Sequence, residues 1–321
     1  MDKARLASRY LVVACAMWGL SFPAGKALIM VQAQLAPEND SWFYSAVGMV
    51  ARFAVAAAIV VGLSWRNRPT VEEIWQGVGV AFFGGVGMLF QLDGLAHTEA
   101  STSAFLTQGS VIFIPLMAAL IQKKRSSLVD VLCIILAIAG VAVLAGFDPR
   151  TLHLGRGEAE TLISALFFTG HIMWLERPRF ANNNSLTVSW IMFALVALIC
   201  VPVVLLSGPG VSLAVSSLSS VSAWFFLGIL IGPCTLMAFL LMNHWQRHIT
   251  ATKAGLIYCL EPVFASLLAL FLPALFSRVA GLDYANETVT VRLLVGGGLV
   301  MAANVLMQAG SSHGAMNERQ L

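Results

Sequence analysis

Two charged side chains lie inside otherwise apolar stretches of the sequence. Arg52 follows ten apolar-leaning residues and precedes an uninterrupted apolar run, and Glu261 stands directly before Pro262 in a second apolar stretch. A charged group is costly in hydrocarbon, so it usually faces the interior of a helix bundle and binds a substrate, an ion or another side chain. Proline also removes a backbone donor, which frees a carbonyl oxygen one turn earlier, at Ile257 or Tyr258. A carboxylate beside a broken helix predicts a binding site for a cationic group or a proton.

Arg52 and Glu261 have two alternative interpretations. They could pair with each other and only hold parts of the bundle together, or Glu261 could bind an ion while Arg52 binds an anionic substrate. An ion pair inside a membrane is a poor stabiliser, because removing both charges from water offsets most of their attraction. We therefore favour the binding interpretation.

Uncharged polar and aromatic side chains add further candidates. Gln108, Thr107 and Ser110 lie in the apolar stretch 99–121. Gln108 either hydrogen-bonds a substrate or bonds a neighbouring helix, and the second is commoner for a lone amide. Trp18 could line a cavity, although tryptophans near helix ends more often anchor at the lipid head groups.

The composition decides which class of protein must position these side chains. Of the 321 residues, 58% are hydrophobic and 11% are charged, and the mean hydropathy is +0.82. A soluble domain needs more charge to cover its surface, so we expect an integral membrane protein in a lipid bilayer. The net charge of +3 is too small to indicate a nucleic-acid partner. The five cysteines lie in apolar stretches without CxxC spacing, so we expect buried thiols, with no disulfide, metal site or cofactor.

Ten stretches are long and apolar enough to cross a membrane as helices. A spanning helix needs about 20 mostly apolar residues, and lipid cannot satisfy free backbone groups. The predicted spans are 10–30, 42–65, 72–95, 99–121, 127–146, 157–175, 186–207, 222–245, 249–272 and 289–308. The expected fold class is an all-α polytopic membrane protein with ten transmembrane helices.

The lysines and arginines between the spans predict the orientation. With the N-terminus inside, 13 of the 19 fall on one side of the membrane and four on the other, and Lys26 and Arg52 lie within spans. Loops on the cytoplasmic side carry the excess of positive charge. We therefore expect both termini in the cytoplasm, and the compact loops suit a bacterial inner membrane.

Two polar side chains lie near opposite faces of the membrane in this topology. Asp93 is near the outer end of the span 72–95, and His244 is near the inner end of the span 222–245. Gates occupy such positions, but so do residues that are simply solvated at the interface. We favour interfacial solvation for both.

The sequence resembles itself at a spacing near 151 residues. Residues 97–101 align without gaps on residues 248–252, and the same register pairs Ser110 with Glu261 and Thr107 with Tyr258. Each half then holds five helices, an odd number, so the second half is inverted relative to the first, as in many secondary transporters. The predicted organisation is a first five-helix repeat at 1–146, an external linker at 147–156, a second repeat at 157–309 and a cytoplasmic tail at 310–321.

Three short segments carry a family resemblance that covers nearly the whole chain in helix number and repeat length. Residues 16–23 (AMWGLSFP), 51–53 (ARF) and 260–265 (LEPVFA) resemble the drug/metabolite transporter superfamily, and within it the EamA-type members with two EamA repeats. The resemblance implies a ten-helix carrier of small organic metabolites, such as amino acids, nucleosides or drugs. Family members often carry Gly-Glu at the end of the fourth helix and its counterpart in the ninth. Residues 123–124 and 274–275 are Lys-Lys and Ala-Leu instead, so the role of that glutamate is not carried over.

The expected function is a secondary transporter that moves a small-molecule substrate by alternating access, as an exporter. A nucleotide-binding loop is missing, so a gradient of the solute, of protons or of another ion must drive transport. The alternatives are an intramembrane enzyme or a membrane scaffold. An enzyme would need paired aspartates or a metal motif, and Asp93 has no acidic partner at its depth in the predicted topology. The sequence leaves a homodimer open.

Overall fold

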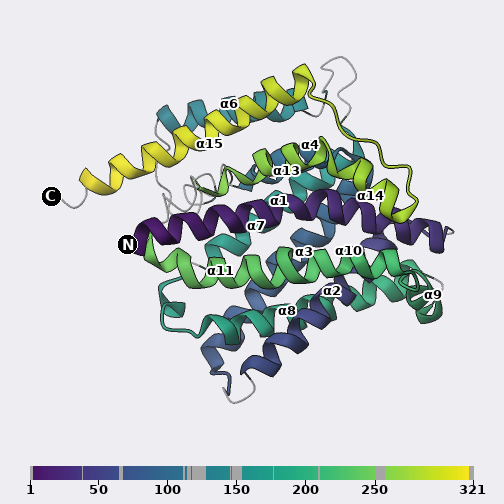
Figure 1. Cartoon of the computed structure of the whole chain (residues 1–321). Helices are drawn as coiled ribbons and strands as arrows, with labels where there is room; N and C mark the ends of the chain where they lie inside the picture. The colour runs from purple at the N-terminus through teal and green to yellow at the C-terminus, as the bar shows by residue number, and fades with distance from the viewer. Residues whose placement is uncertain are drawn as a thin grey trace.

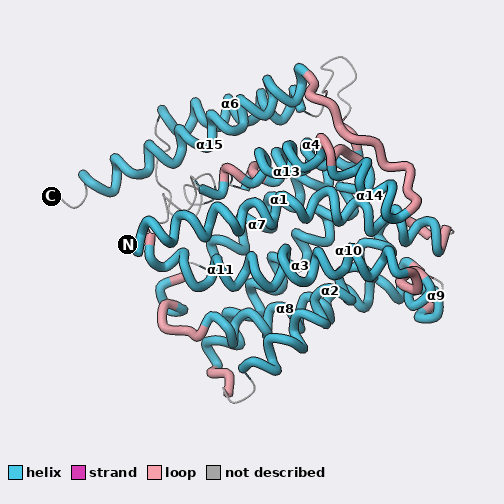
Figure 2. Tube along the Cα trace, in the orientation of Figure 1, coloured by secondary structure: helices cyan, strands magenta, loops and turns pink. Residues whose placement is uncertain are grey.

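The chain folds into a bundle of helices that run roughly alongside one another (Figure 1). The computed structural model describes residues 3–317 except 38, 65–67, 111–112, 114–116, 118–127, 145, 147–153, 176, 209 and 250–256. Within that part of the chain every regular element is a helix, and loops make the connections (Figure 2). In chain order the helices are α1 (Lys3–Leu35), α2 (Ser41–Ser64), α3 (Val71–His97), α4 (Ala100–Thr107), α6 (Leu128–Leu144), α7 (Arg156–Leu175), η1 (Pro178–Phe180), α8 (Ser185–Ser207), α9 (Val211–Ser216), α10 (Val221–Ile231), η2 (Gly232–Met237), α11 (Ala238–Trp245), η3 (Gln246–His248), α13 (Glu261–Ala269), α14 (Leu272–Ala280) and α15 (Val291–Asn317).

Several predicted features lie outside the described residues. They include parts of the fourth and ninth predicted spans and most of the predicted linker 147–156. Some of the lysines and arginines that predict the orientation also lie outside the described residues. They are Arg66, Lys123, Lys124, Arg125, Arg150, Lys253 and Arg319.

Within the described residues, five helices are long and apolar enough to cross a membrane. They are α1, α2, α3, α8 and the continuous stretch Val221–Met242, and the bent pair α13 and α14 makes a sixth if it counts as one span. Shorter apolar helices occur at Val131–Leu144 and Val291–Leu306. The chain is therefore an all-helical, multi-pass integral membrane protein, while a count of ten spans stays a prediction.

Local sequence signals fix where several helices begin. Thr70 caps α3, because its hydroxyl accepts from Glu73 N while the Glu73 carboxylate accepts from Thr70 N, which satisfies two backbone donors reciprocally. Asn184 caps α8 through its side-chain oxygen, which accepts from Leu186 N at 2.9 Å and from Thr187 N at 3.5 Å. The helices that they cap begin at Val71 and Ser185, within one residue of the predicted starts at 72 and 186.

The eighth predicted span contains an irregular turn that the sequence analysis did not predict. Residues Gly232–Met237 form a π-helix between α10 and α11. Pro233 at its start has no backbone N–H to donate, and π-helical turns occur frequently at functional sites. This turn lies next to Arg52.

The ninth predicted span is not one continuous helix in its described part. Helix α13 begins at Glu261, the chain bends by 55°, and α14 then continues to Ala280, eight residues beyond the predicted end at 272. The break falls at Phe271, just before a proline at position 273 that cannot donate to the preceding turn. Glu261 is thus the first residue of a helix rather than the middle of one.

The packing of the helices brings both predicted halves together. Helix α1 packs on α10, α11 and α13, whereas α7 packs on α3 and α4, and α2 packs on α8. The largest buried apolar cluster lies between α2, α3 and α8, with Phe53 and Phe193 at its centre. Helices α6 and α15 pack side by side at one edge of the bundle (Figure 1).

Candidate functional site

Arg52 is buried in α2 and is held by the π-helical turn. Its Nε donates to Thr235 Oγ1 at 2.5 Å, and its Nη2 donates to the Cys234 carbonyl oxygen at 3.3 Å. Thr235 in turn donates to the carbonyl oxygen of Leu230, five residues earlier. The wide turn therefore provides two neutral acceptors that orient the guanidinium without neutralising its charge.

Arg52 and Glu261 do not pair with each other. Among the described residues, the three ion pairs are Arg156–Asp93, Arg156–Glu160 and Arg179–Glu72. Glu261 instead accepts a hydrogen bond from Gln108 Nε2 at 3.4 Å. The two charges therefore stand in separate surroundings, and the ion-pair interpretation does not describe this structure.

Gln108 bonds a neighbouring helix, which is the commoner of its two predicted roles. It stands at the end of α4 and reaches Glu261 at the start of α13. Thr107 accepts from Gln91 Nε2 at 3.0 Å and donates to the carbonyl oxygen of Ser103, and the carbonyl oxygen of Ser110 accepts from a threonine of α7 at 3.2 Å. These groups are already engaged, so their part in binding a substrate stays a prediction.

An aromatic cluster lies between α1, α11 and α13. Trp18 makes edge-to-face contacts with Phe239 and Tyr258, whose ring centroids are 5.6 and 5.8 Å away. The Tyr258 hydroxyl donates to Gln246 Oε1 at 2.8 Å. The carbonyl oxygen of Ile257, one of the two expected to be freed by the proline at 262, accepts from Leu260 N and from the Cys15 thiol. Trp18 thus packs inside the bundle, but it is not shown to line a cavity.

Asp93 is not a solvated interfacial residue, contrary to our expectation. Its side chain is fully buried, and Oδ2 lies 2.6 Å from Nη2 of Arg156 at the start of α7. Arg156 Nε also lies 2.9 Å from Oε1 of Glu160, so two carboxylates share one guanidinium. The expectation that Asp93 has no acidic partner was therefore also wrong. Arg156 and Glu160 lie 63 and 67 positions after Asp93 in the sequence, and Arg156 contacts both carboxylates. Since Arg156 holds both carboxylates, this pair does not resemble a free catalytic dyad.

The helices carrying this ion pair approach each other closely. A Cβ added to Gly94 would lie 2.7 Å from the carbonyl oxygen of Gly157, and one added to Gly157 would lie 2.7 Å from that of Gly94. Only glycine at both positions lets the backbones of α3 and α7 come this near. Helices α3 and α7 are therefore in tight contact beside Asp93.

His244 lies at the opposite end of the bundle and is exposed. Its ring contacts Trp245 edge to face at 5.0 Å between centroids and lies 6.1 Å from His248. Trp245 also stacks on Tyr10 of α1. The exposure is compatible with interfacial solvation, and gating at His244 stays untested.

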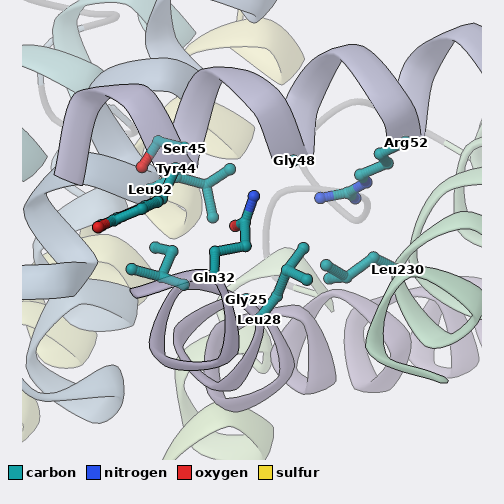
Figure 3. Close-up of a pocket in the computed structure, with 10 residues that line it drawn as sticks. Gly25, Leu28, Gln32, Tyr44, Ser45, Gly48, Arg52, Leu92 and Leu230 are labelled. Carbon is teal, nitrogen blue, oxygen red and sulfur yellow. The ribbon is translucent and has the colours of Figure 1, made fainter. Parts of the chain in front are cut away.

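A small cavity between α1 and α2 contains polar groups that the sequence analysis missed. Its lining includes Gln32 of α1 and Ser45 and Arg52 of α2, and Figure 3 shows the Gln32 amide rising toward α2 with the Arg52 guanidinium on the far side. Gln32 is fully buried, and neither its Nε2 nor its Oε1 has a hydrogen-bond partner among the described residues. The buried Ser45 Oγ has none among them either. Gln32 lies just outside the predicted span 10–30, which is why it was overlooked.

Comparisons with known proteins support the resemblance seen in the sequence. Residues 6–146 match the EamA-like transporter family. The chain is 28% identical over 192 residues to an uncharacterized transporter from Archaeoglobus fulgidus (strain ATCC 49558 / DSM 4304 / JCM 9628 / NBRC 100126 / VC-16), a match that covers 59% of this chain and 58% of that relative.

A solved crystal structure, described only as that of a protein, is similar over 91% of this chain and 96% of its own. The TM-score is 0.51 at 18% sequence identity, so this likeness concerns the fold alone. Two of the three segments that resemble EamA-type transporters, residues 16–23 and 51–53, lie inside the matched region, so the comparisons support an EamA-type transporter.

Proposed function

We propose that this protein is a secondary transporter that exports a small organic metabolite across the membrane by alternating access. The observation that carries the proposal is the match of residues 6–146 to the EamA-like transporter family in a multi-pass helical chain. The name of the Archaeoglobus fulgidus relative points the same way.

The contacts between helices support a chain whose two halves share one arrangement of five helices. If α1, α2, α3, α4 and α6 correspond to α7, α8, α10–α11, α13 and α15, the most extensive contacts between the two halves have counterparts. The packing of α1 on α10, α11 and α13 corresponds to the packing of α7 on α3 and α4. The pairs α2–α8, α4–α13 and α6–α15 each join corresponding helices. Such a pattern is what two inverted five-helix repeats would produce, with a substrate site between them.

Glu261 is the proposed site of the coupling proton or another ion. Its only described polar partner is the neutral amide of Gln108, which contributes from the corresponding helix of the other half. A carboxylate without a cationic partner in a membrane interior gains from binding a proton or a cation. Helix α13 also begins at Glu261, directly after a turn at residues 259–260 that interrupts the regular helix.

The contact between α3 and α7 is the proposed outer gate. The ion pair Asp93–Arg156 and the close approach of Gly94 and Gly157 join the two halves at one end of the bundle. Opening that end would separate the guanidinium from a buried carboxylate, so a substrate or an ion must compensate. The inner gate is assigned to the end that carries His244. Helix α1 begins and α15 ends at that side (Figure 1), and the excess of lysine and arginine supports a cytoplasmic location for both termini of a bacterial inner-membrane protein.

Metabolite profiling of cells and spent medium tests the proposal. Cells expressing wild type, Glu261→Gln or Glu72→Gln are compared at matched membrane abundance. Glu72 is a suitable control because it is half-exposed and lies 3.7 Å from Arg179 at the surface. We expect a small group of compounds to leave the cells with wild type and Glu72→Gln but not with Glu261→Gln.

Two results would contradict the proposal. Chemical conversion of compounds without their movement would favour an intramembrane enzyme. Unchanged transport and an unchanged pH dependence in Glu261→Gln would remove Glu261 from the mechanism.

A further inference from the structure

The cavity beside Arg52 concentrates unmet hydrogen-bonding capacity and an uncompensated charge. Arg52 is only 6% exposed, and none of the ion pairs among the described residues includes it. Burying a charge without a counter-charge is strongly unfavourable. Its two recorded acceptors, Thr235 and the Cys234 carbonyl, are neutral.

The unpartnered groups are aimed into the same space. Gln32 has two donor hydrogens and an acceptor oxygen without partners at 0% exposure, and Ser45 Oγ lacks a partner at 1% exposure. More than nine in ten buried polar groups in proteins do have a partner, so three orphaned atoms lining one cavity call for an explanation. Figure 3 shows the Gln32 amide, Ser45 and the Arg52 guanidinium around this space.

Ordered water accounts for only part of the observation. Water could satisfy the amide and the hydroxyl, because polar cavities hold water. It could not neutralise the guanidinium, and the described cavity lining contains no carboxylate to do so. An anion satisfies both requirements, and a planar carboxylate matches the donor geometry of a guanidinium.

We propose that the cavity binds a small organic carboxylate that carries a hydroxyl or similar polar group close to its carboxylate. Arg52 binds the carboxylate, and Gln32 and Ser45 form hydrogen bonds with the polar group. The proposal rests on the transport function and names the substrate class for it.

The spacing of the lining residues limits the size of the solute. Ser45, Gly48 and Arg52 lie on one face of α2, and seven residues of helix span about 10 Å along the axis. The free volume of the cavity is about 10 Å³, close to that of one water molecule, so a solute of a few atoms would enter only if the Gln32 and Leu28 side chains moved aside. Gly48 keeps the space open, because a Cβ there would meet Leu28 at 3.2 Å and Gln32 Oε1 at 3.7 Å.

The test measures binding to the purified full chain in lipid nanodiscs by thermal unfolding. The probes are sodium glycolate, the neutral isostere glycolamide and sodium chloride at matched ionic strength. A ligand that binds only the folded protein raises its unfolding temperature in a concentration-dependent way. We expect glycolate to do so saturably and the other two to have no such effect.

Variants then assign the binding to this cavity. We expect Arg52→Gln and Gln32→Leu each to weaken glycolate binding about tenfold or more, and Ser45→Ala to weaken it about threefold, as is typical of a lost hydrogen bond to a charged or neutral group. Ser64→Ala is the matched control, because Ser64 is a buried serine of the same helix that bonds only to the carbonyl oxygen of Val60. Glycolate binding to Ser64→Ala should stay within about twofold of wild type.

Gln32→Leu also separates binding from structure. If the amide awaits a ligand, its removal should leave the ligand-free protein as stable as wild type or more stable, because an orphaned buried amide is destabilising. If Arg52→Gln fails to fold, glycolate binding to Gln32→Leu and Ser45→Ala still tests whether the ligand occupies this cavity.

Three outcomes would overturn the proposal: no effect of glycolate, an equal effect of chloride or glycolamide, or unchanged binding in Gln32→Leu. The transport function fails separately. If glycolate does not bind while cells export neutral or cationic metabolites, the carboxylate site is wrong and transport stands. If glycolate binds but no solute crosses the membrane in proteoliposomes, the site stands and transport is wrong.

Discussion

The buried charges beside the Arg52 cavity and in the cluster of Asp93, Arg156 and Glu160 differ in their partners: the cluster contains counter-charges, and Arg52 has neutral acceptors. Asp93 is fully buried, but Arg156 meets it at 2.6 Å and meets Glu160 at 2.9 Å. Arg52 is buried beside the unpartnered amide of Gln32, with only neutral acceptors. The comparison suggests that a buried charge with a counter-charge holds helices together, although Asp93 Oδ1 and Glu160 Oε2 accept no hydrogen bond from the described residues. A buried charge without a counter-charge marks a space that a ligand can fill.

The largest expected effect concerns the ion-paired cluster of Asp93, Arg156 and Glu160. Arg156→Ala would leave two carboxylates without their cation, one of them fully buried. We expect a loss of about 2–3 kcal/mol in stability, less than for a fully buried pair because Arg156 is half-exposed. Thermal unfolding in detergent would measure it as a shift of several degrees.

The surface pair Arg179–Glu72 provides the control for that prediction. Its N–O distance is 3.7 Å and both side chains are half-exposed. Arg179→Ala should therefore cost less than about 1 kcal/mol. Equal losses of stability for Arg156→Ala and Arg179→Ala would show that the Asp93 cluster stabilises the fold no more than a surface ion pair does.

The second prediction tests the close approach of α3 and α7. Gly94→Ala would place a Cβ 2.7 Å from the carbonyl oxygen of Gly157. Because neither backbone can yield easily, we expect a loss of about 1–3 kcal/mol, again measured by thermal unfolding. Gly298→Ala is the control, because no atom lies within 4 Å of a Cβ there. A tolerated Gly94→Ala would mean that the two helices are not in tight contact.

The third prediction concerns the segment between α14 and α15, which Figure 2 shows as a long loop. Glu287 on this loop accepts from Ala100 N at 2.6 Å and from Ser101 N at 3.3 Å, so its carboxylate caps α4. Glu287→Gln should cost about 0.5–2 kcal/mol and speed hydrogen exchange at these two amides. Asp283→Asn, an exposed change in the same loop, should leave the exchange unaffected. Unchanged exchange in Glu287→Gln would refute the cap.

The smallest expected effect comes from a second unsatisfied group. Tyr284 lies in the same loop, outside the membrane-spanning helices, and its buried hydroxyl has no partner. Burial, and then the neighbouring Glu287 carboxylate, raise the pKa of Tyr284. A raised pKa means that the folded protein resists ionisation of the phenol. The titration of Tyr284 therefore leaves stability unchanged below the unfolded pKa, about 10, and lowers it as the pH rises from there toward the raised folded-state pKa.

Tyr284→Phe should therefore be neutral or slightly stabilising at neutral pH and should reduce the loss of stability above about pH 10. Tyr44→Phe is the contrasting variant, because the Tyr44 hydroxyl donates to the Ala36 carbonyl oxygen at 2.5 Å. It should cost about 1 kcal/mol at neutral pH. Thermal unfolding from pH 7 to 11 separates the two, and equal losses for both variants at pH 7 would contradict the assignment.

The sequence predicted most helices because their apolar length and caps are local properties. Helices α2, α3 and α8 begin within one residue of the predicted spans. The bend between α13 and α14 was missed, since Pro273 was included in neither span and its effect depends on how the flanking helices pack.

The partners of the buried charges could not be predicted because they come from distant parts of the chain. Arg156 lies 63 residues after Asp93, and Thr235 lies 183 residues after Arg52. Position along a helix suggested that Asp93 faces solvent, but the closeness of α3 and α7 buries it. Gln32 was missed because position near a helix end does not reveal a cavity.

The most direct test of the account is a transport measurement with the purified protein alone. Liposomes loaded with a bacterial metabolite extract, with and without the reconstituted chain, are separated from the medium, and both fractions are profiled by mass spectrometry. The account predicts that a small group of unmodified solutes leaves only the liposomes that contain the protein. Full retention of every solute under inward and outward proton gradients, or the appearance of new products, would contradict it.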